Sequence, residues 1–333
     1  MKKIVTMKDI ANITGFSIQT ISRVINGSTN VKPQTKKIIE DVIKECGYKP
    51  NIFARNLGGS KKNKNILISV KVNSNHTATI WLNLLISRII ALNKDENTSI
   101  VLEQYYDEID FKRSILNRSN GFIDGVIIFY EEKNDKRIEL LKKENIPYVI
   151  YGQSYNKDDI YIAIDSKNSI IKGTEYLFAR GMKRLIFITA NPSPINIERE
   201  KGITEAFSKN GVELSNLRII KYITNQEETY NLVKDLYKKK ELPEAFFISG
   251  DEKAIGVLKA LYDLKIKVPE EISVMGFDDI PISKYFSPAL STISFDYDII
   301  ATKLLKKINN LINNKIEISE EISGKLIIRE SIK

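Results

Sequence analysis

The chain has 333 residues, of which 42% are hydrophobic and 28% are charged, a composition typical of a globular protein of two or three domains. It holds one cysteine, Cys46, and one histidine, His76, which excludes a disulfide within the chain and argues against a metal cluster or a serine–histidine catalytic site. The N-terminus lacks the apolar core of a signal peptide, and no run of about 18 apolar residues occurs. We therefore expect a cytoplasmic protein with no membrane span, no metal and no cofactor.

The positive charge is concentrated at the N-terminus. Residues 1–64 contain 13 Lys and Arg against 4 Asp and Glu, which accounts for the whole net charge of +9. The other 38 of the 51 basic residues are balanced by the other 38 of the 42 acidic residues. A basic segment on a neutral body indicates nucleic-acid binding, because lysines and arginines neutralise phosphates. A Lys-rich genome is the alternative, but it would have spread the excess along the chain.

Two short helices are predicted first. Thr6 and Asp9 are spaced as a capping box, which begins a helix that Gly15 ends. Ser17 caps a second helix over residues 18–25. Helical spacing turns a few apolar side chains of the two helices inward, namely Met7, Ile10, Ala11, Ile21, Val24 and Ile25.

A third helix is predicted from Pro33 to Glu45, and Cys46-Gly47 ends it. Its expected inward residues are Ile38, Ile39, Val42 and Ile43. Cys46 is expected to be a small packing residue of this helical domain rather than a reactive thiol.

The first two helices and their glycine-containing turn predict a helix–turn–helix, in which the second helix enters the major groove of DNA. Gln19 can pair with adenine, Arg23 can pair with guanine, and Ile18 can contact a thymine methyl group. The alternative is a solvated helix face, which the local basic charge disfavours. The residues of these helices predicted to contact DNA are Thr6, Ser17, Ile18, Gln19, Thr20, Ser22, Arg23 and Asn26.

Residues 7–57 resemble the DNA-binding head of the lactose/galactose repressor family, most specifically through S-I-Q-T-I-S-R-V-I-N-G at residues 17–27. The resemblance implies a hinge helix at residues 50–57, which folds when two copies meet on operator DNA and inserts its leucine into the minor groove. A helix of about seven residues is marginal alone, which is consistent with such behaviour. The alternative is an ordinary linker, since Gly58-Gly59-Ser60 follows. The matching residues are Asn51, Ala54, Arg55 and Leu57.

From Asn65 onward, short apolar runs alternate with helical patterns, which predicts parallel sheets with helices on both faces. This part is too long for one sheet, so two lobes are expected, and no G-x-G-x-x-G or P-loop occurs. Strands are predicted at residues 66–72, 100–103, 126–129, 148–151, 160–164, 185–189, 246–249, 273–277 and 326–330. Helices are predicted at about 80–94, 134–144, 166–180, 198–210, 227–240, 252–264 and 299–314.

The body resembles the same family through P-E-E-I-S-V-M-G-F-D-D at 269–279 and F-S-P-A-L-S-T-I at 286–293. Two weaker matches are S-G-D-x4-G at 249–256 and R-E-K-G at 199–202. The resemblance implies a fold similar to periplasmic sugar-binding proteins: two lobes, crossed three times by the chain, with a ligand between them. The expected organisation is a helix–turn–helix domain at 1–50, a hinge helix and linker at 51–64, and an effector-binding and dimerisation body at 65–333. Within that body, one lobe takes about 65–162 and 293–325, and the other about 163–292.

Five residues of the body are candidate effector contacts. Asp278 and Asp165 directly follow predicted strands, and ligands of open parallel sheets sit beyond the carboxyl ends of strands. A carboxylate there can accept hydrogen bonds from sugar hydroxyls. The resemblance adds Arg199, which matches a ligand-contacting arginine, and Trp81, at a position where the family places an aromatic residue in the cleft. Asp251 opens a predicted helix.

Four of these candidates also have a structural alternative. Asp278 and Arg199 can be an ion pair or turn residues, Trp81 can belong to the core, and Asp251 can be a helix cap. The chain also departs from the family after the strand that ends at Tyr151. It has Gly152-Gln153 where the family commonly has an acid that meets the effector. The resemblance therefore does not identify a particular sugar.

The leading hypothesis is a sequence-specific DNA-binding regulator, expected to be a repressor of carbohydrate-utilisation genes, that is not an enzyme. A small molecule, expected to be a sugar or sugar derivative, binds between the lobes and controls operator affinity. No heptad segment follows the last predicted strand, so we expect a homodimer that reads palindromic double-stranded operator DNA. The rival hypothesis is a sugar-handling enzyme or a transport binding protein with a basic tail.

Overall fold

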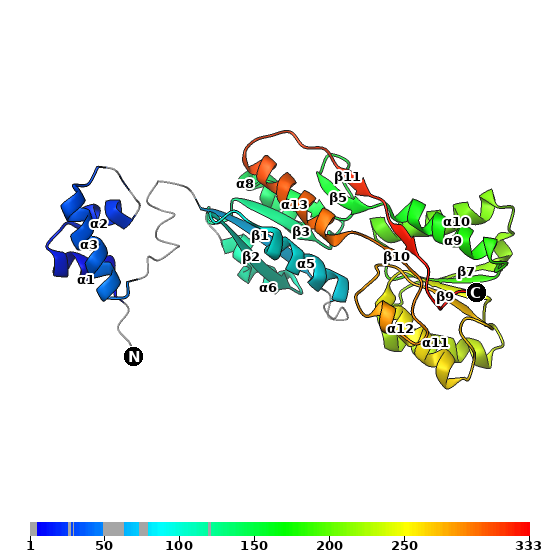
Figure 1. Cartoon of the computed structure of the whole chain (residues 1–333). Coiled ribbons are helices and arrows are strands. Elements are labelled where there is room, and N and C mark those ends of the chain that lie inside the picture. The colour runs from blue at the N-terminus through cyan, green and yellow to red at the C-terminus, as the bar shows by residue number, and fades with distance from the viewer. Residues whose placement is uncertain (1–4, 26–27, 29, 49–62, 73–78, 119–120) are drawn as a thin grey trace. The chain divides into compact units, whose positions relative to one another are not determined.

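The computed structural model describes residues 5–25, 28, 30–48, 63–72, 79–118 and 121–333. The chain divides into two compact units (Figure 1). One, here called the head, comprises Met1–Lys64 with Glu96–Ser99, and the other, called the body, comprises Asn65–Asp95 with Ile100–Lys333.

The head contains the three predicted helices, α1 (Met7–Thr14), α2 (Ile18–Ile25) and α3 (Pro33–Glu45). The Thr6 hydroxyl accepts from the Asp9 N–H at 3.3 Å and the Asp9 carboxylate accepts from the Thr6 N–H at 2.8 Å, so the predicted capping box is confirmed. Gly15 ends α1 in the left-handed region, with φ 71°. The Ser17 hydroxyl accepts from the Thr20 N–H at 3.2 Å, which caps α2 as predicted.

The head has its own small core. Its buried hydrophobic residues are Ile10, Ile21, Val24, Ile39 and Tyr48. The prediction that Ile38 points inward is wrong, because 48% of this residue is exposed. Successive residues of a helix lie about 100° apart, and the inward stripe of α3 runs through Ile39.

The first sheet of the body has the strand order β11-β5-β4-β3-β1-β2. Four of its strand pairs, β1/β3, β3/β4, β4/β5 and β5/β11, are parallel. All five residues of β3 are buried, as expected for a parallel strand between two layers of helices. The strands are β1 (Lys64–Lys71), β2 (Thr98–Tyr105), β3 (Gly125–Phe129), β4 (Tyr148–Tyr151), β5 (Tyr161–Ile164) and β11 (Glu320–Ile322).

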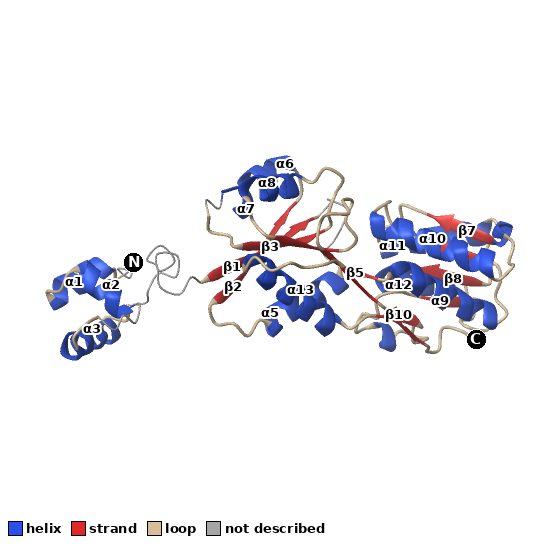
Figure 2. Cartoon of the chain, turned by 90° about the horizontal axis from the view of Figure 1, so that it is seen from above, coloured by secondary structure: helices blue, strands red, loops and turns tan. Residues whose placement is uncertain are grey.

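Helices cover both faces of this sheet (Figure 2). Ile66 and Ile68 of β1 share a core with α5 (Ile80–Leu92) and α13 (Tyr297–Ile312). The intervening Leu67 points to the opposite face, because side chains alternate along a strand. That face is covered by α6 (Glu108–Arg113), α7 (Ile115–Arg118) and α8 (Lys136–Glu144).

The second sheet has the order β7-β6-β8-β9, and its strands are parallel. They are β6 (Leu185–Ile188), β7 (Leu217–Ile220), β8 (Ala245–Ile248) and β9 (Ser273–Met275). Phe187 and Phe247 face α9 (Ser166–Ala179) and α10 (Pro194–Lys209). Phe246 and Ile248, which alternate with Phe247 along β8, face α11 (Gln226–Lys238) and α12 (Asp251–Asp263).

The glycines of two family-like motifs are points of close helix contact. A Cβ on Gly256 of α12 would lie 1.9 Å from the carbonyl oxygen of Gln226, and one on Gly202 of α10 would lie 2.6 Å from that of Lys167. Neither position has room for a side chain. The two glycines therefore allow α12 to pack against α11, and α10 against α9.

The chain passes between the two sheets three times, as the resemblance implies. It leaves β5 for α9, returns through β10 (Thr292–Ser294) to α13, and leaves β11 through β12 (Lys325–Ile327), which pairs with β10 in antiparallel fashion. Beyond β12, the Ser331 hydroxyl donates to the carbonyl of Val274 in the second sheet at 2.6 Å. These three crossings connect the two sheets within the body.

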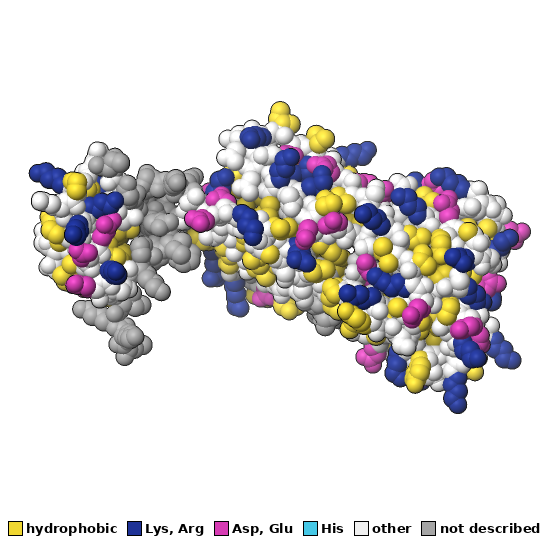
Figure 3. Space-filling view, viewed as in Figure 1, with side chains coloured by type: hydrophobic (Ala, Val, Ile, Leu, Met, Phe, Trp, Pro, Cys, Tyr) yellow, Lys and Arg dark blue, Asp and Glu magenta, His cyan; other side chains and the backbone are white. Residues whose placement is uncertain are grey.

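Several short elements were not predicted: α6, α7, β7, β10, β11 and the 3-10 turns Leu214–Asn216 and Ser283–Tyr285. They are too short or too polar to carry a hydrophobic period, as in β7, where Arg218 is exposed, and in β11, which begins Glu-Glu. Helix α10 begins at Pro194, four residues before the prediction. Within the described ranges, no helix has the length and apolarity that a bilayer crossing requires. On the face of the body drawn in Figure 3, Lys and Arg side chains are interspersed with Asp and Glu side chains.

Candidate functional site

The exposed face of α2 is the candidate DNA-binding surface. Ile18 is 48% exposed, and Gln19 and Arg23 are also exposed, whereas Ile21 is fully buried. Thr20 and Ser22 are half-buried at the edge of this face. The arrangement presents an apolar side chain, an amide and a guanidinium together, which are the groups that read base edges in a major groove.

Of the other predicted DNA contacts, two have side chains that already cap a helix, and five lie outside the described residues. The Thr6 hydroxyl donates to the Asp9 carboxylate at 2.6 Å, so its side chain already serves the cap of α1. Ser17 likewise serves α2, with its hydroxyl 2.9 Å from that of Thr20. Asn26, Asn51, Ala54, Arg55 and Leu57 lie outside the described residues.

The body contains a cavity of about 460 Å³. Its walls come from the carboxyl ends of strands in both sheets: Lys71 is the last residue of β1, Tyr130 follows β3, and Ser249 follows β8. A further wall comes from residues 190–193 and from residues 194–196 at the start of α10. This is where parallel α/β sheets bind ligands, and the volume suits a small organic molecule.

Three aromatic residues form one side of the cavity. The ring of Trp81 meets that of Tyr130 edge-on at 5.9 Å and that of Tyr151 at 5.7 Å. Trp81 both packs against the core and lines the cavity, so the two alternatives for this residue are not exclusive. An aromatic wall of this kind suits the apolar face of a sugar ring.

Arg199 enters the cavity from α10. It is 8% exposed, its guanidinium lies 4.3 Å from the centroid of the Phe277 ring, and Nη1 donates to Asn196 Oδ1 at 3.1 Å. Its buried Nε has no hydrogen-bond partner among the described residues. Burial lowers the pKa of Arg199. A buried donor without a partner is unusual and is suited to receive a ligand.

Asp278 and Lys253 face the same region. Asp278 follows the buried Phe277 and has φ 106°, a backbone conformation that non-glycine residues rarely adopt and that clusters at functional sites. Burial raises the pKa of Asp278 to about 8. Lys253, in the first turn of α12, is 8% exposed, and its Nζ donates to the carbonyl and hydroxyl of Ser249 at 3.2 and 3.3 Å. Burial lowers the pKa of Lys253 to about 8.

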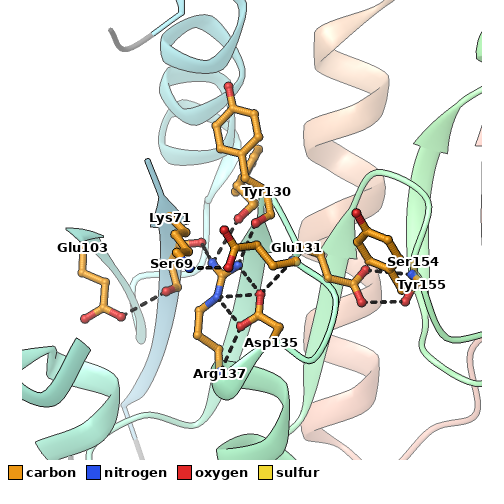
Figure 4. A network of polar contacts seen from close by, with 11 residues as sticks. Ser69, Lys71, Glu103, Tyr130, Glu131, Asp135, Arg137, Ser154 and Tyr155 are labelled. Atoms are coloured by element: carbon orange, nitrogen blue, oxygen red, sulfur yellow. Dashed lines mark hydrogen bonds and ion pairs between the residues drawn. The ribbon is translucent and has the colours of Figure 1, made fainter. Parts of the chain in front are cut away.

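A buried arginine fixes the wall that carries Tyr130 (Figure 4). The Arg137 guanidinium is fully buried and donates to the carbonyls of Ser69, Phe129 and Tyr130 at 2.9, 3.0 and 3.0 Å. It also donates to the Asp135 carboxylate at 2.6 Å. These carbonyls lie at the ends of β1 and β3, so Arg137 ties both strand ends to the loop that borders the cavity.

The neighbouring Glu131 lines the cavity at the same wall. Its carboxylate accepts from the Ser154 hydroxyl at 3.1 Å and from the Tyr155 N–H at 3.3 Å. Burial nevertheless raises the pKa of Glu131 to about 7. The adjacent Glu132 is paired with Lys71. The acids of this wall therefore already have partners.

Two of the five predicted effector contacts do not line the cavity. Asp251 is fully buried as the first residue of α12 and accepts from Ser283 Oγ, Thr292 Oγ1 and the Ile280 N–H at 2.6, 2.7 and 3.1 Å. It joins three segments, and burial raises its pKa to about 7. Asp165 instead caps α9, accepting from the Asn168 N–H at 3.1 Å.

The structure thus brings Trp81, Arg199 and Asp278 together and adds residues that the sequence did not single out. These are chiefly Tyr130, Tyr151, Asn196 and Lys253. A signal for Lys253 was present, since it lies in the first turn of a helix that follows a strand. Among the described residues, no group of three or more His, Cys, Asp and Glu side chains could hold a metal ion.

Comparisons with known proteins agree with this arrangement. Residues 6–51 match "Bacterial regulatory proteins, lacI family" and residues 174–332 match a "Periplasmic binding protein-like domain". Catabolite control protein A of Staphylococcus aureus is 30% identical over 321 residues, covering 94% of this chain and 94% of that protein.

Two solved structures share the fold. The lac repressor dimer bound to operator and the anti-inducer ONPF has a TM-score of 0.82 and 22% identity, with 99% of each chain covered. The complex of the transcriptional regulator CelR with cellobiose has a TM-score of 0.72 and 22% identity, covering 98% of this chain and 99% of that one. The predicted combination of a helix–turn–helix head and a periplasmic-binding-protein-like body is confirmed. The chain belongs to the lacI family of bacterial regulatory proteins and is a DNA-binding transcriptional regulator.

Proposed function

We propose that this regulator is a homodimeric repressor of carbohydrate-utilisation genes that acts in the cytoplasm by binding rather than by catalysis. The observation that carries the proposal is the pairing of a helix–turn–helix head with a body cavity lined by Trp81, Arg199 and Asp278. Its operator is a palindrome, because two identical heads read two identical half-sites. The S. aureus relative's name, which refers to catabolite control, supports a role in carbon metabolism.

In the head, residues 1–50, Gln19 and Arg23 read base edges and Ile18 contacts a thymine methyl group. Their exposure on α2 supports this role. Thr6, Ser17, Thr20, Ser22 and Asn26 position the helix on the DNA. In residues 51–64, we propose a hinge helix in which Leu57 enters the minor groove beside Ala54 and Arg55, with Asn51 at its start.

In the body, residues 65–333, the ligand is a sugar or sugar derivative. Trp81 stacks on the sugar ring, Asp278 accepts from hydroxyls, and Arg199 donates through its free Nε. The aromatic wall and the buried polar groups support this assignment, as does the cellobiose that the CelR structure contains. Asp251 and Asp165 hold the surrounding segments in place rather than touching the ligand.

Ligand control of DNA binding requires a difference in ligand affinity between the DNA-competent and DNA-incompetent states. The cavity has walls from both sheets, and the chain crosses between the sheets three times. A ligand that draws the two walls together therefore changes the geometry of the segments that lead to the head.

The test uses the full-length protein. Bound duplexes are selected from a random DNA library, and the recovered sequence is titrated with sugars in a fluorescence anisotropy assay. Recovery of a palindrome whose affinity changes with a sugar supports the proposal. A sugar that is turned over chemically would instead make the chain an enzyme.

A further inference from the structure

We propose that the ligand of the cavity is an anionic carbohydrate, carrying a carboxylate or a phosphate, and that Lys253 and Arg199 hold its charged group. This inference rests on the proposed function, because it takes the cavity as a carbohydrate site. It adds the chemical class of the ligand and assigns a role to Lys253.

The first observation is the burial of a lysine that has no acidic partner. Lys253 is 8% exposed, although lysine ammonium groups are rarely buried without an opposite charge. Its hydrogen bonds in the structure go to the carbonyl and hydroxyl of Ser249, which are both neutral. Among the ion pairs of the described residues, none includes Lys253. The cavity therefore holds an ammonium whose charge is left for a ligand to neutralise.

The second observation is the similar state of Arg199 on the same wall. Its side chain is 8% exposed and donates to the neutral Asn196, and within the part of the chain that the structure describes its buried Nε has no partner. The Phe277 ring covers one face of the guanidinium at 4.3 Å. That leaves the edge of the guanidinium as the part able to bind a carboxylate or phosphate, which it can do through two parallel hydrogen bonds.

The third observation is the balance of charge around these two cations. Asp278 is the cavity-lining acid that acts on both of them, and no ion pair in the structure joins it to either Lys253 or Arg199. Glu252 and Glu228 also act on Lys253 through their charges, but they do not line the cavity and accept hydrogen bonds from the N–H groups of Ile80 and Thr224. The acids of the opposite wall are engaged elsewhere, Glu132 with Lys71 and Glu131 with Ser154 and Tyr155. The residues that line the cavity include four basic side chains, Lys71, Lys133, Arg199 and Lys253, against three acids, Glu131, Glu132 and Asp278, so the lining has an excess of positive charge. A neutral sugar would leave that excess uncompensated.

The test is a thermal-shift and calorimetric comparison of matched ligands on the full-length protein. Each series contains a neutral hexose, its uronate and its 6-phosphate, for glucose, galactose and mannose, with acetate and inorganic phosphate as probes of the anionic group alone. We expect at least one uronate or sugar phosphate to stabilise the protein more than its neutral counterpart. The uronate and phosphate arms show which group is recognised.

Two substitutions separate charge from packing. Lys253→Met removes the ammonium and keeps an unbranched chain, and it should lower the affinity for the anionic ligand about tenfold or more. Lys253→Arg should retain most of that affinity. Lys259→Met is the matched control, because Lys259 lies on the same helix but is exposed and paired with Asp263. The melting temperatures of the unliganded variants report whether each one folds.

The outcomes distinguish this inference from the proposed function. The inference is overturned if the protein binds neutral sugars in preference to charged ones. It is also overturned if Lys253→Met lowers the affinity for neutral and charged sugars equally. Either result leaves the proposal of a sugar-controlled regulator intact. If no carbohydrate of either kind stabilises the protein or changes operator affinity, both proposals fail. Stabilisation by acetate or inorganic phosphate alone would mean that the site binds small anions and not carbohydrates, which also overturns the inference.

Discussion

The Glu252 carboxylate accepts a hydrogen bond from the backbone N–H of Ile80. Glu252 lies in the first turn of α12, which packs on the second sheet, and Ile80 is the first residue of α5, which packs on the first sheet. The bond therefore links the two halves of the body beside Trp81 and the cavity. A carboxylate at a helix N-terminus is also favoured by the helix dipole.

Removing this link should weaken ligand binding. We expect Glu252→Ala to lower ligand affinity by about threefold to tenfold, because one charge-assisted hydrogen bond between the two walls is lost. Glu252→Gln, which keeps an acceptor, should have a smaller effect. Isothermal titration calorimetry measures both. Glu227→Ala, an exposed acid in the first turn of α11, is the control and should leave the affinity unchanged.

Ligand affinity should depend on pH if the ligand is anionic. The pKa of Lys253 is about 8, so Lys253 loses its charge as the pH rises through that value. The pKa of Asp278 is also about 8, so Asp278 gains a negative charge over the same range. Both changes disfavour an anion, and we expect affinity to fall about tenfold or more from about pH 7 to about pH 9.

Arg199, Glu252 and Glu228 also act on Lys253 through their charges. The variant Lys253→Arg keeps its charge throughout this range, so its decline with pH should be shallower than that of the unmodified protein. Calorimetry at several pH values, in buffers of constant ionic strength, gives both curves. A constant affinity in the unmodified protein would contradict this charge assignment.

The hydrogen bonds and the ion pair of Arg137, here called the Arg137 network, should contribute strongly to stability at the carboxyl ends of β1 and β3. Arg137→Met leaves the Asp135 carboxylate and three strand-end carbonyls buried without their donor, and a loss of about 3–5 kcal/mol in the free energy of unfolding is expected. Denaturant unfolding measures this loss. Arg113→Met is the control: Arg113 is exposed on α6, and a change within about 0.5 kcal/mol is expected. Equal effects of the two substitutions would show that the network contributes little.

Arg23→Ala tests how the head reads DNA. If Arg23 pairs with a guanine, the substitution should cost about 1–3 kcal/mol on the selected operator and relax the preference at one base position. Lys44→Ala, at the end of α3, should lower the affinity for every duplex equally or leave it unchanged. Anisotropy titrations with the operator and single-base variants measure both. A uniform loss for Arg23→Ala would instead indicate a phosphate contact.

Local interactions explain why the head was predictable. Thr6, Asp9 and Gly15 act on residues within four positions, so their spacing alone sets the bounds of α1. The continuous apolar runs of strands such as β3 were equally clear, since both of their faces are buried. Edge strands and single-turn helices, including β7 and α7, lack such a signal.

The cavity was predictable only in part. Arg199, Asp278 and Trp81 followed from strand ends and from the family resemblance. The role of Asp251 depends on Ser283 and Thr292, which lie 32 and 41 residues away in sequence, so spacing could not reveal it. Lys253 lines the cavity because of how α12 packs on its sheet and against α11, where Gly256 makes a close contact, and such long-range packing cannot be read from local spacing.

In the proposed function, a carbohydrate bound in the body controls sequence-specific DNA binding by the head. The most direct test of this control is the affinity of the full-length protein for the selected palindrome, with and without the stabilising carbohydrate, at near-physiological salt. We expect specific binding that survives this salt and changes at least about tenfold with the ligand. Binding that shows no sequence preference, disappears with salt and ignores every carbohydrate would contradict it.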